Sequence, residues 1–120
     1  MAESLNKFLK SFSYAIKGIV VSIRDQRNLK VQATIAAIVV GAGFYFRITS
    51  IEWCIILFTI ALVIGLEMIN SAVENLVDLV TRQYDPLAGK VKDIAAGAVL
   101  FVSVIAVIIG ILVFRKYLMS

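Results

Sequence analysis

Three long apolar runs, separated by short polar segments, dominate this 120-residue chain. Residues 29–48 and 92–114 are about as long as a helix that crosses a bilayer. Residues 51–82 would extend about 48 Å, more than the roughly 30 Å hydrocarbon core. Hydrophobic residues make up 61% of the sequence and the mean hydropathy is +0.95, more than a soluble domain of this size normally carries. The sequence therefore predicts an all-α membrane protein with three spans, forming one domain over residues 1–120.

The amino-terminal segment, residues 4–24, has the pattern of an amphipathic surface helix. Its apolar face comprises Leu5, Phe8, Leu9, Phe12, Ile16, Ile19 and Ile23, opposite Lys7, Lys10 and Lys17. A charged helix of this kind favours lying in the membrane interface over spanning the membrane. The same pattern fits a plain membrane anchor equally well.

Four polar residues interrupt the second apolar run at helical spacing: Glu67, Asn70, Glu74 and Asp78. Spacings of three and four residues place them in one stripe along a helix. Ionisable groups inside a membrane are costly, so they usually face a bundle interior or an aqueous cavity and mark a functional site. Because the apolar part of the run comes first, Glu67 is expected to lie deepest and Asp78 nearest the water.

Polar segments predict where the helices end. Thr49 or Ser50 is positioned to cap the second span, ahead of Glu52. Pro86 cannot continue the second span, and Gly89 is expected to add a further break before the third.

The basic residues predict the orientation of the chain. Nine of the twelve Lys and Arg residues fall on the side of the amino terminus, and only Arg47, Arg115 and Lys116 fall on the other. The positive-inside rule then predicts a cytoplasmic amino terminus, a polar stripe that opens on the cytoplasm, and a carboxyl terminus outside. The basic residues are scattered along helices, so nucleic acid is not an expected partner. The sequence contains no P-loop motif, so a P-loop ATPase is not expected either.

An antiparallel second and third span would bring Lys92 and Asp93 to the level of Asp78. Acids beside bases at one interface suit phosphoryl transfer, which needs Mg²⁺, cations for phosphate oxygens and a base near the acceptor hydroxyl. Glu74 is the candidate Mg²⁺ ligand and Glu67 the candidate general base. Asn70 is expected to orient either partner through hydrogen bonds.

Other functions fit parts of this pattern. Polar residues also join transmembrane helices by hydrogen bonds, as in an inert assembly subunit. A small proton-coupled transporter could use Glu67 as its proton carrier. A transporter needs access from both faces, whereas this stripe runs toward one face only.

Residues 67–78, EMINSAVENLVD, resemble the signature of the bacterial membrane-integral diacylglycerol and undecaprenol kinase family. Residues 92–99, KDIAAGAV, are similar to its second conserved block, and Tyr14 to Gly18 with Arg27-Asn28 to its amino-terminal portion. The similarity covers nearly the whole chain. It implies a homotrimer in the bacterial inner membrane, with active sites shared between subunits. The implied activity moves the γ-phosphoryl group of ATP onto the hydroxyl of undecaprenol or diacylglycerol.

The resemblance also implies roles for individual residues. Glu67 matches the catalytic base, Asn70 its polar neighbour at the lipid substrate, and Glu74 a ligand of the nucleotide's Mg²⁺. Residues that match nucleotide contacts are Lys7, Tyr14, Gln26, Glu74, Gln83, Tyr84, Asp85, Lys92 and Asp93.

Three positions bear on how this chain differs within the family. Gln26 stands where a second metal-binding Glu is usual, so Asp25 substitutes, Gln26 binds through its carbonyl oxygen, or the metal site is weaker. Lys7 stands where Arg is common in the family. Its ammonium group keeps the positive charge but cannot form the two parallel hydrogen bonds that a guanidinium group forms with a phosphate. Ala96, expected near the lipid substrate, makes the second block more like that of undecaprenol kinases than of diacylglycerol kinases.

Overall fold

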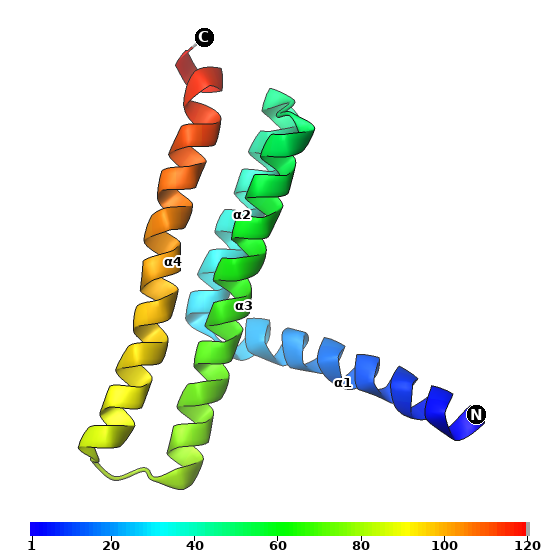
Figure 1. Cartoon of the computed structure of the whole chain (residues 1–120), viewed down its shortest axis with the longest axis vertical. Helices are drawn as coiled ribbons and strands as arrows, with labels where there is room; N and C mark the ends of the chain where they lie inside the picture. The colour runs from blue at the N-terminus through cyan, green and yellow to red at the C-terminus, as the bar shows by residue number, and fades with distance from the viewer. Residues whose placement is uncertain (120) are drawn as a thin grey trace.

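Four helices account for nearly all of the chain in the computed structural model, which describes residues 1–119 (Figure 1). They are α1 (Ala2–Asp25), α2 (Arg27–Phe46), α3 (Ser50–Val80) and α4 (Pro86–Met119). The last three lie side by side, with α3 in contact with both α2 and α4. Each of these three is long and apolar enough to cross a membrane. The predicted all-α membrane fold with three candidate spans is confirmed.

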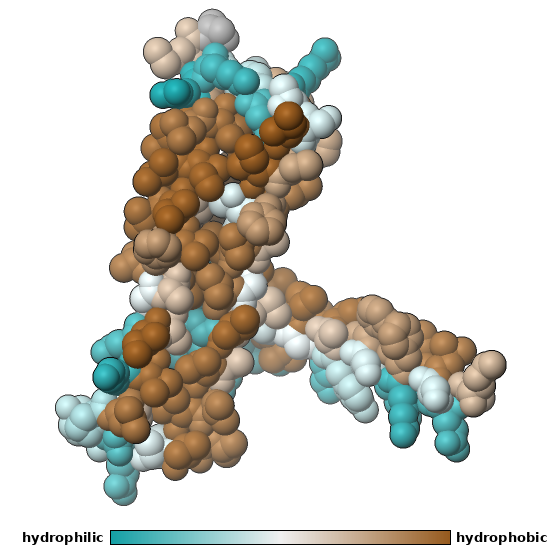
Figure 2. Space-filling model, in the orientation of Figure 1, coloured by the Kyte–Doolittle hydropathy of each residue, from teal (hydrophilic) through white to brown (hydrophobic). Residues whose placement is uncertain are grey.

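The surface helix α1 leaves the bundle at a steep angle (Figure 1). The chain turns at Gln26, whose backbone is extended (φ −107°, ψ 115°) between two helices. Figure 2 shows the apolar side of α1 turned toward the apolar part of the spans, and its polar side toward the end where α3 and α4 are joined. This is the placement expected of a helix that lies in a membrane interface. We refer to this end of the spans as the α1 end and to the opposite end as the far end.

At the far end, a tight connection joins α2 to α3. Arg47 adopts the left-handed conformation (φ 54°), and the Ile48 amide donates to the Gly43 carbonyl at 3.2 Å, which closes the end of α2. Thr49 then caps α3: its hydroxyl accepts from the Glu52 amide at 3.2 Å, and the Glu52 carboxylate accepts from the Thr49 amide at 2.9 Å. This reciprocal pair is a capping box, and it confirms the predicted cap ahead of Glu52.

The connection between α3 and α4 differs from the prediction in one respect. The second break expected at Gly89 is wrong, because α4 already begins at Pro86 and Gly89 lies within it. Pro suits the first position of a helix, where its missing N–H group has no intrahelical partner to lose. The Asp85 carboxylate accepts hydrogen bonds from the amides of Leu87 at 2.8 Å and Ala88 at 3.3 Å, so it caps the helix.

Few side chains are buried within the described part of the chain. The buried apolar residues are Leu29, Ile48, Ile56, Val99 and Val113. Most other apolar side chains of the spans are exposed, and Figure 2 shows them as a broad apolar surface between two polar ends. A bilayer or a second copy of the chain can cover such a surface, whereas water cannot do so without a large hydrophobic penalty.

A polar cluster ties the ends of α3 and α4 together at the far end. The Lys116 ammonium lies 2.9 Å from the Glu52 carboxylate, and the Tyr117 hydroxyl donates to the same carboxylate. The Glu52 side chain is only 13% exposed, so these partners offset the cost of burying its charge. The two spans are therefore fixed to each other at the end remote from the predicted active site.

Candidate active site

The polar stripe of α3 passes from the interior of the bundle to its surface. Glu67 is 3% exposed and Asn70 is 7% exposed, Glu74 is half-buried, and Asp78 is exposed. This gradient runs toward the α1 end, where α3 and α4 extend past the level of α1 (Figure 1). The stripe therefore links a buried carboxyl group to the polar end of the bundle, the order of burial expected from the sequence.

Two amide side chains of α2 lie beside the carboxyl group of Glu67. These are Asn28 and Gln32, which approach it from the first turns of α2. Asn70 Oδ1 and Gln32 Oε1 are buried without a hydrogen-bond partner among residues 1–119. Buried polar atoms are rarely left unpaired in native proteins, so these two oxygens are available to a ligand's hydroxyl group or to water. Sequence reasoning did not assign Asn28 or Gln32 to the site, although Gln32 is a polar exception in an apolar run.

Glu74 lies one turn from Asn70 and closer to the surface. The Asn70 side-chain amide donates to the Glu74 carboxylate at 3.4 Å, which orients both groups on the same side of α3. A half-buried carboxylate is a hard oxygen ligand of the kind that Mg²⁺ prefers. No cluster of three or more Asp, Glu, Cys or His side chains suited to a metal is found in the described residues. The donor set therefore fits an ion that is shared with a phosphate group better than one enclosed by the protein alone.

Lys92 of α4 meets the outer end of the stripe. Its ammonium group lies 2.7 Å from the Asp78 carboxylate, and the two side chains are 39% and 50% exposed. The predicted approach of Lys92 to Asp78 is thus present in the structure. Such an exposed pair adds little stability, so Lys92 can exchange Asp78 for another anion at small cost.

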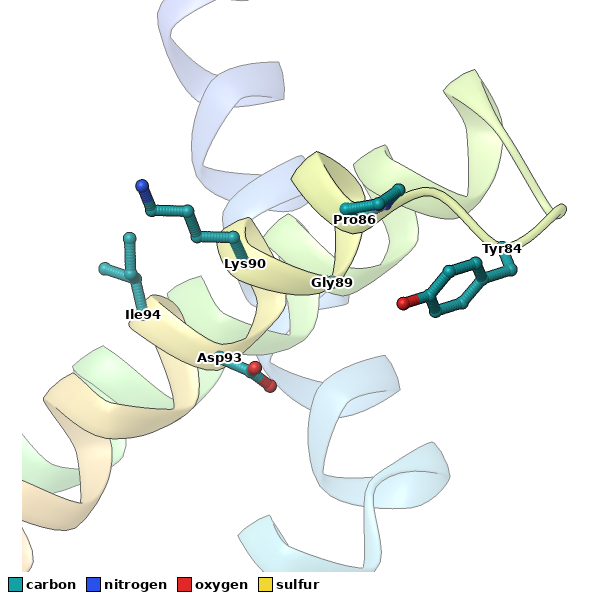
Figure 3. Close-up of a pocket in the computed structure, with 6 residues that line it drawn as sticks. All are labelled: Tyr84, Pro86, Gly89, Lys90, Asp93 and Ile94. Atoms are coloured by element: carbon teal, nitrogen blue, oxygen red, sulfur yellow. The ribbon is translucent and has the colours of Figure 1, made fainter.

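An open cavity of about 500 Å³ lies on the first turns of α4 (Figure 3). Its lining includes Tyr84 and Asp93, two of the predicted nucleotide contacts, and also Lys90. In Figure 3 the hydroxyl of Tyr84 and the carboxyl of Asp93 point toward the same space; Lys90 also lines the cavity, but its ammonium group points away from them. Lys92 is turned instead toward Asp78 on α3. The structure therefore separates Lys92 from Asp93 around α4, and it adds Lys90, which sequence reasoning did not assign to the site.

Three predicted site residues, Lys7, Tyr14 and Ala96, are exposed, and Lys7 lies far from the stripe of its own chain. Lys7 precedes Asp25 by 18 residues, which places it about 27 Å along α1 from the bundle. Tyr14 also lies on the exposed part of α1, at 69% exposure. Ala96 is exposed on α4, next to the half-buried Ala95.

The two candidates for the second metal ligand lie at the elbow between α1 and α2. Gln26 is half-buried there. Asp25 is exposed and forms an ion pair with Arg24 at 2.9 Å, and the hydrogen bond from Arg24 lowers the pKa of the Asp25 carboxyl group. Asp25 is therefore charged at neutral pH but already paired.

Comparison with known proteins identifies the family of this chain. A sequence model described as prokaryotic diacylglycerol kinase matches residues 13–114. An undecaprenol kinase of Bacillus subtilis is 44% identical over 112 residues, which cover 93% of this chain and 91% of the relative. A diacylglycerol kinase of Synechocystis is 38% identical over 85% of this chain and 59% of the relative. A diacylglycerol kinase of Escherichia coli is 26% identical over 85% of this chain and 84% of the relative.

The three apolar helices and these relatives define the chain as a multi-pass bacterial membrane protein and a lipid kinase, a class of transferase. The chain belongs to the prokaryotic diacylglycerol kinase family. Kinases of this kind carry out ATP-dependent phosphoryl transfer. The comparisons give no support to the alternative of a proton-coupled transporter.

Proposed function

We propose that this chain transfers the γ-phosphoryl group of ATP to the hydroxyl group of undecaprenol or diacylglycerol at the membrane surface. The relatives' names supply these two acceptor lipids. The observation that carries the proposal is the set of polar side chains around Glu67. A buried carboxyl group lies beside amide side chains with unpaired oxygens, on a stripe that leads to a lysine at the polar end of the bundle.

In the proposed mechanism, Glu67 acts as the general base. The lipid hydroxyl lies beside its carboxylate, and Asn70 orients the hydroxyl through a hydrogen bond. As the bond forms between the hydroxyl oxygen and the γ-phosphorus, Glu67 accepts the hydroxyl proton. The bond between the γ-phosphorus and the bridging oxygen breaks, and ADP leaves. Lys92 releases Asp78 and binds phosphate oxygens with its ammonium group.

Glu74 would hold Mg²⁺ together with the phosphate oxygens of the nucleotide, and Gln26 would contribute an amide oxygen. The half-buried Glu74 carboxylate beside Asn70 fits this ion chemically. Bound there, Mg²⁺ supplies positive charge that offsets the charge on the phosphate oxygens. Tyr84 and Asp93 face the open cavity at the start of α4, which suits the nucleoside part of ATP, and Gln83 and Asp85 adjoin Tyr84 in the sequence.

We propose that the functional unit is a homotrimer whose sites are shared between copies. The distance along α1 supports this arrangement, because α1 extends away from the spans (Figure 1) and carries Lys7 about 27 Å from the bundle. In an assembly, the polar face of α1 can lie against the stripe of a neighbouring copy. The excess of basic residues near the α1 end supports a cytoplasmic location for this end in the bacterial inner membrane.

Lipid phosphorylation by the purified protein in bilayers tests the proposal. The wild type should phosphorylate undecaprenol or diacylglycerol with Mg²⁺-ATP, and removal of Mg²⁺ with EDTA should abolish the reaction. Glu67→Gln should abolish turnover while nucleotide binding and the assembly persist, because the amide keeps the shape but cannot accept the proton. Glu3→Gln, which neutralises an exposed acid on α1, is the matched control and should keep full activity. Undiminished turnover by Glu67→Gln would reject Glu67 as the base.

A further inference from the structure

A second cavity lies among the three spans, at membrane depth. It is a groove of about 260 Å³ between α2 and α4, with α3 as its floor. Its lining is almost entirely apolar. Since α2 and α4 both run from the α1 end to the far end, Gln32 and Ser103 mark its beginning at the α1 end, and Val39 and Gly110 mark its deep end.

The groove begins at the catalytic carboxyl group. Gln32 lines the groove and also lies beside the Glu67 carboxyl, so the two sites share this side chain. On α3, Ile64 lines the groove one helical turn before Glu67. The unpaired Gln32 Oε1 atom lies at this junction. A molecule whose polar head lies at Glu67 can therefore continue directly into an apolar channel.

We propose that this groove binds the hydrocarbon tail of the acceptor lipid, and that it takes a single chain. This inference rests on the lipid kinase function proposed above and adds a tail-binding site to it. An apolar lining suits a hydrocarbon and offers nothing to a nucleotide. A volume of about 260 Å³ is below the range of typical pockets for drug-sized ligands, so it leaves room for one narrow chain and not for two. The second chain of a diacyl lipid stays in the surrounding bilayer.

The length of the groove predicts which part of the tail it contacts. Gln32 and Val39 are seven residues apart on α2, so the groove is about 10 Å long. It therefore contacts the part of the lipid tail that lies within about 10 Å of the head group. A tail that is shorter than this does not reach Gly110, whereas a long prenyl or acyl chain does. A bulky side chain at the deep end therefore distinguishes long tails from short ones.

Gly110→Phe is the variant that fills the deep end. A Cβ atom at Gly110 meets no atom within 4 Å, so the side chain can enter the groove without displacing backbone. Gly41→Phe is the matched control, because Gly41 has equally open surroundings but lies outside the groove lining. Rates are measured with Mg²⁺-ATP and two single-chain prenols, one of a single isoprene unit, which is shorter than the groove, and one of eleven.

For Gly110→Phe we expect kcat/KM to fall about tenfold or more with the long prenol and to change less than about twofold with the short one. Gly41→Phe should have the same kcat/KM as the wild type with both prenols. Retained activity on the short prenol also shows that the variant is folded. Equal effects of Gly110→Phe on both prenols would overturn the proposal.

Trp53 provides a readout that does not depend on activity. It is the single tryptophan of the chain and packs against the cluster of Ile48, Ile56 and Val113, beside the deep end of the groove. A long prenol brominated on its second and third isoprene units, which would lie at the deep end of the groove, should quench Trp53 fluorescence in a saturable way. A brominated phospholipid at the same mole fraction should not. Gly110→Phe should lose the saturable quenching, and Gly41→Phe should keep it.

The outcomes separate this proposal from the proposed function. Saturable quenching without phosphorylation of either prenol or of diacylglycerol would reject the kinase function and leave the groove as a lipid site. Phosphorylation without saturable quenching would reject the groove. If Gly110→Phe instead changes the oligomeric state and quenching is absent, the groove holds a helix of a second copy and the tail proposal is wrong.

Discussion

Replacing Gly43 by alanine should weaken the junction of α2 and α3 at the far end. A Cβ atom at this position would lie 2.7 Å and 2.9 Å from the Trp53 ring atoms Cη2 and Cζ2, and 3.2 Å from Ile48 Cδ1. The ring cannot move freely, because Trp53 also packs against Phe44 with 4.9 Å between ring centroids. The added methyl group must therefore displace the indole ring or separate the two helices.

The size of the effect follows from a comparison of two glycines. Overpacking in a well-packed site costs about 1–3 kcal/mol. Alanine also favours the helix over glycine by roughly 0.5–1 kcal/mol, and this gain partly offsets the clash. Gly41→Ala has the same helical gain, but its Cβ atom meets nothing within 4 Å. The difference in the free energy of unfolding between the two variants should thus isolate the clash, about 1–3 kcal/mol.

Denaturation of the two purified variants in the same detergent measures this difference. The fluorescence of Trp53 gives a second observable, since Gly43→Ala should shift its emission and Gly41→Ala should not. Equal stability of the two variants together with unchanged Trp53 emission would refute the contact between Gly43 and the indole ring.

Three further substitutions test the ion pair, the role of Lys92 and the helix cap. Asp78→Asn should change the free energy of unfolding by less than about 1 kcal/mol, because the pair with Lys92 is exposed. Lys92→Ala should raise the KM for ATP, and a KM equal to that of the wild type would contradict its role at the phosphates. Thr49→Ala removes the acceptor for the Glu52 amide and should destabilise the protein by about 0.5–2 kcal/mol in thermal or denaturant unfolding. Ser50→Ala serves as its control, and equal losses in both variants would argue against the capping box.

Much of the fold follows from local sequence signals. The apolar runs are long enough to identify three spans, and Thr49 with Glu52 identifies the start of α3. The start of α4 was harder to predict because Pro86 and Gly89 both suggest a break. Asp85 resolves the conflict in favour of a helix that begins at Pro86, since its carboxylate binds the first free amides.

The candidate site can be predicted from the sequence along α3 and, through the antiparallel spans, at Lys92 beside Asp78. Helical periodicity alone places Glu67, Asn70 and Glu74 on one face, and this needs no knowledge of the neighbouring helices. Which side chains of α2 and α4 face that stripe depends on how each helix is rotated about its axis. For this reason the sequence pattern does not identify Asn28 and Gln32, and it places Lys92 and Asp93 together although they point to different sides of α4.

The position of α1 bears directly on how a site could be completed. The cations of α1 face the polar side of the membrane interface, and the helix carries Lys7 about 27 Å away from the stripe of its own chain. A bend at Gln26 large enough to return Lys7 to that stripe would remove the apolar face of α1 from the interface. In the proposed homotrimer, binding to a neighbouring copy would preserve this apolar contact and would still bring Lys7 and Tyr14 to a nucleotide. The amphipathic pattern of α1 thus favours sites shared between copies over sites within one chain.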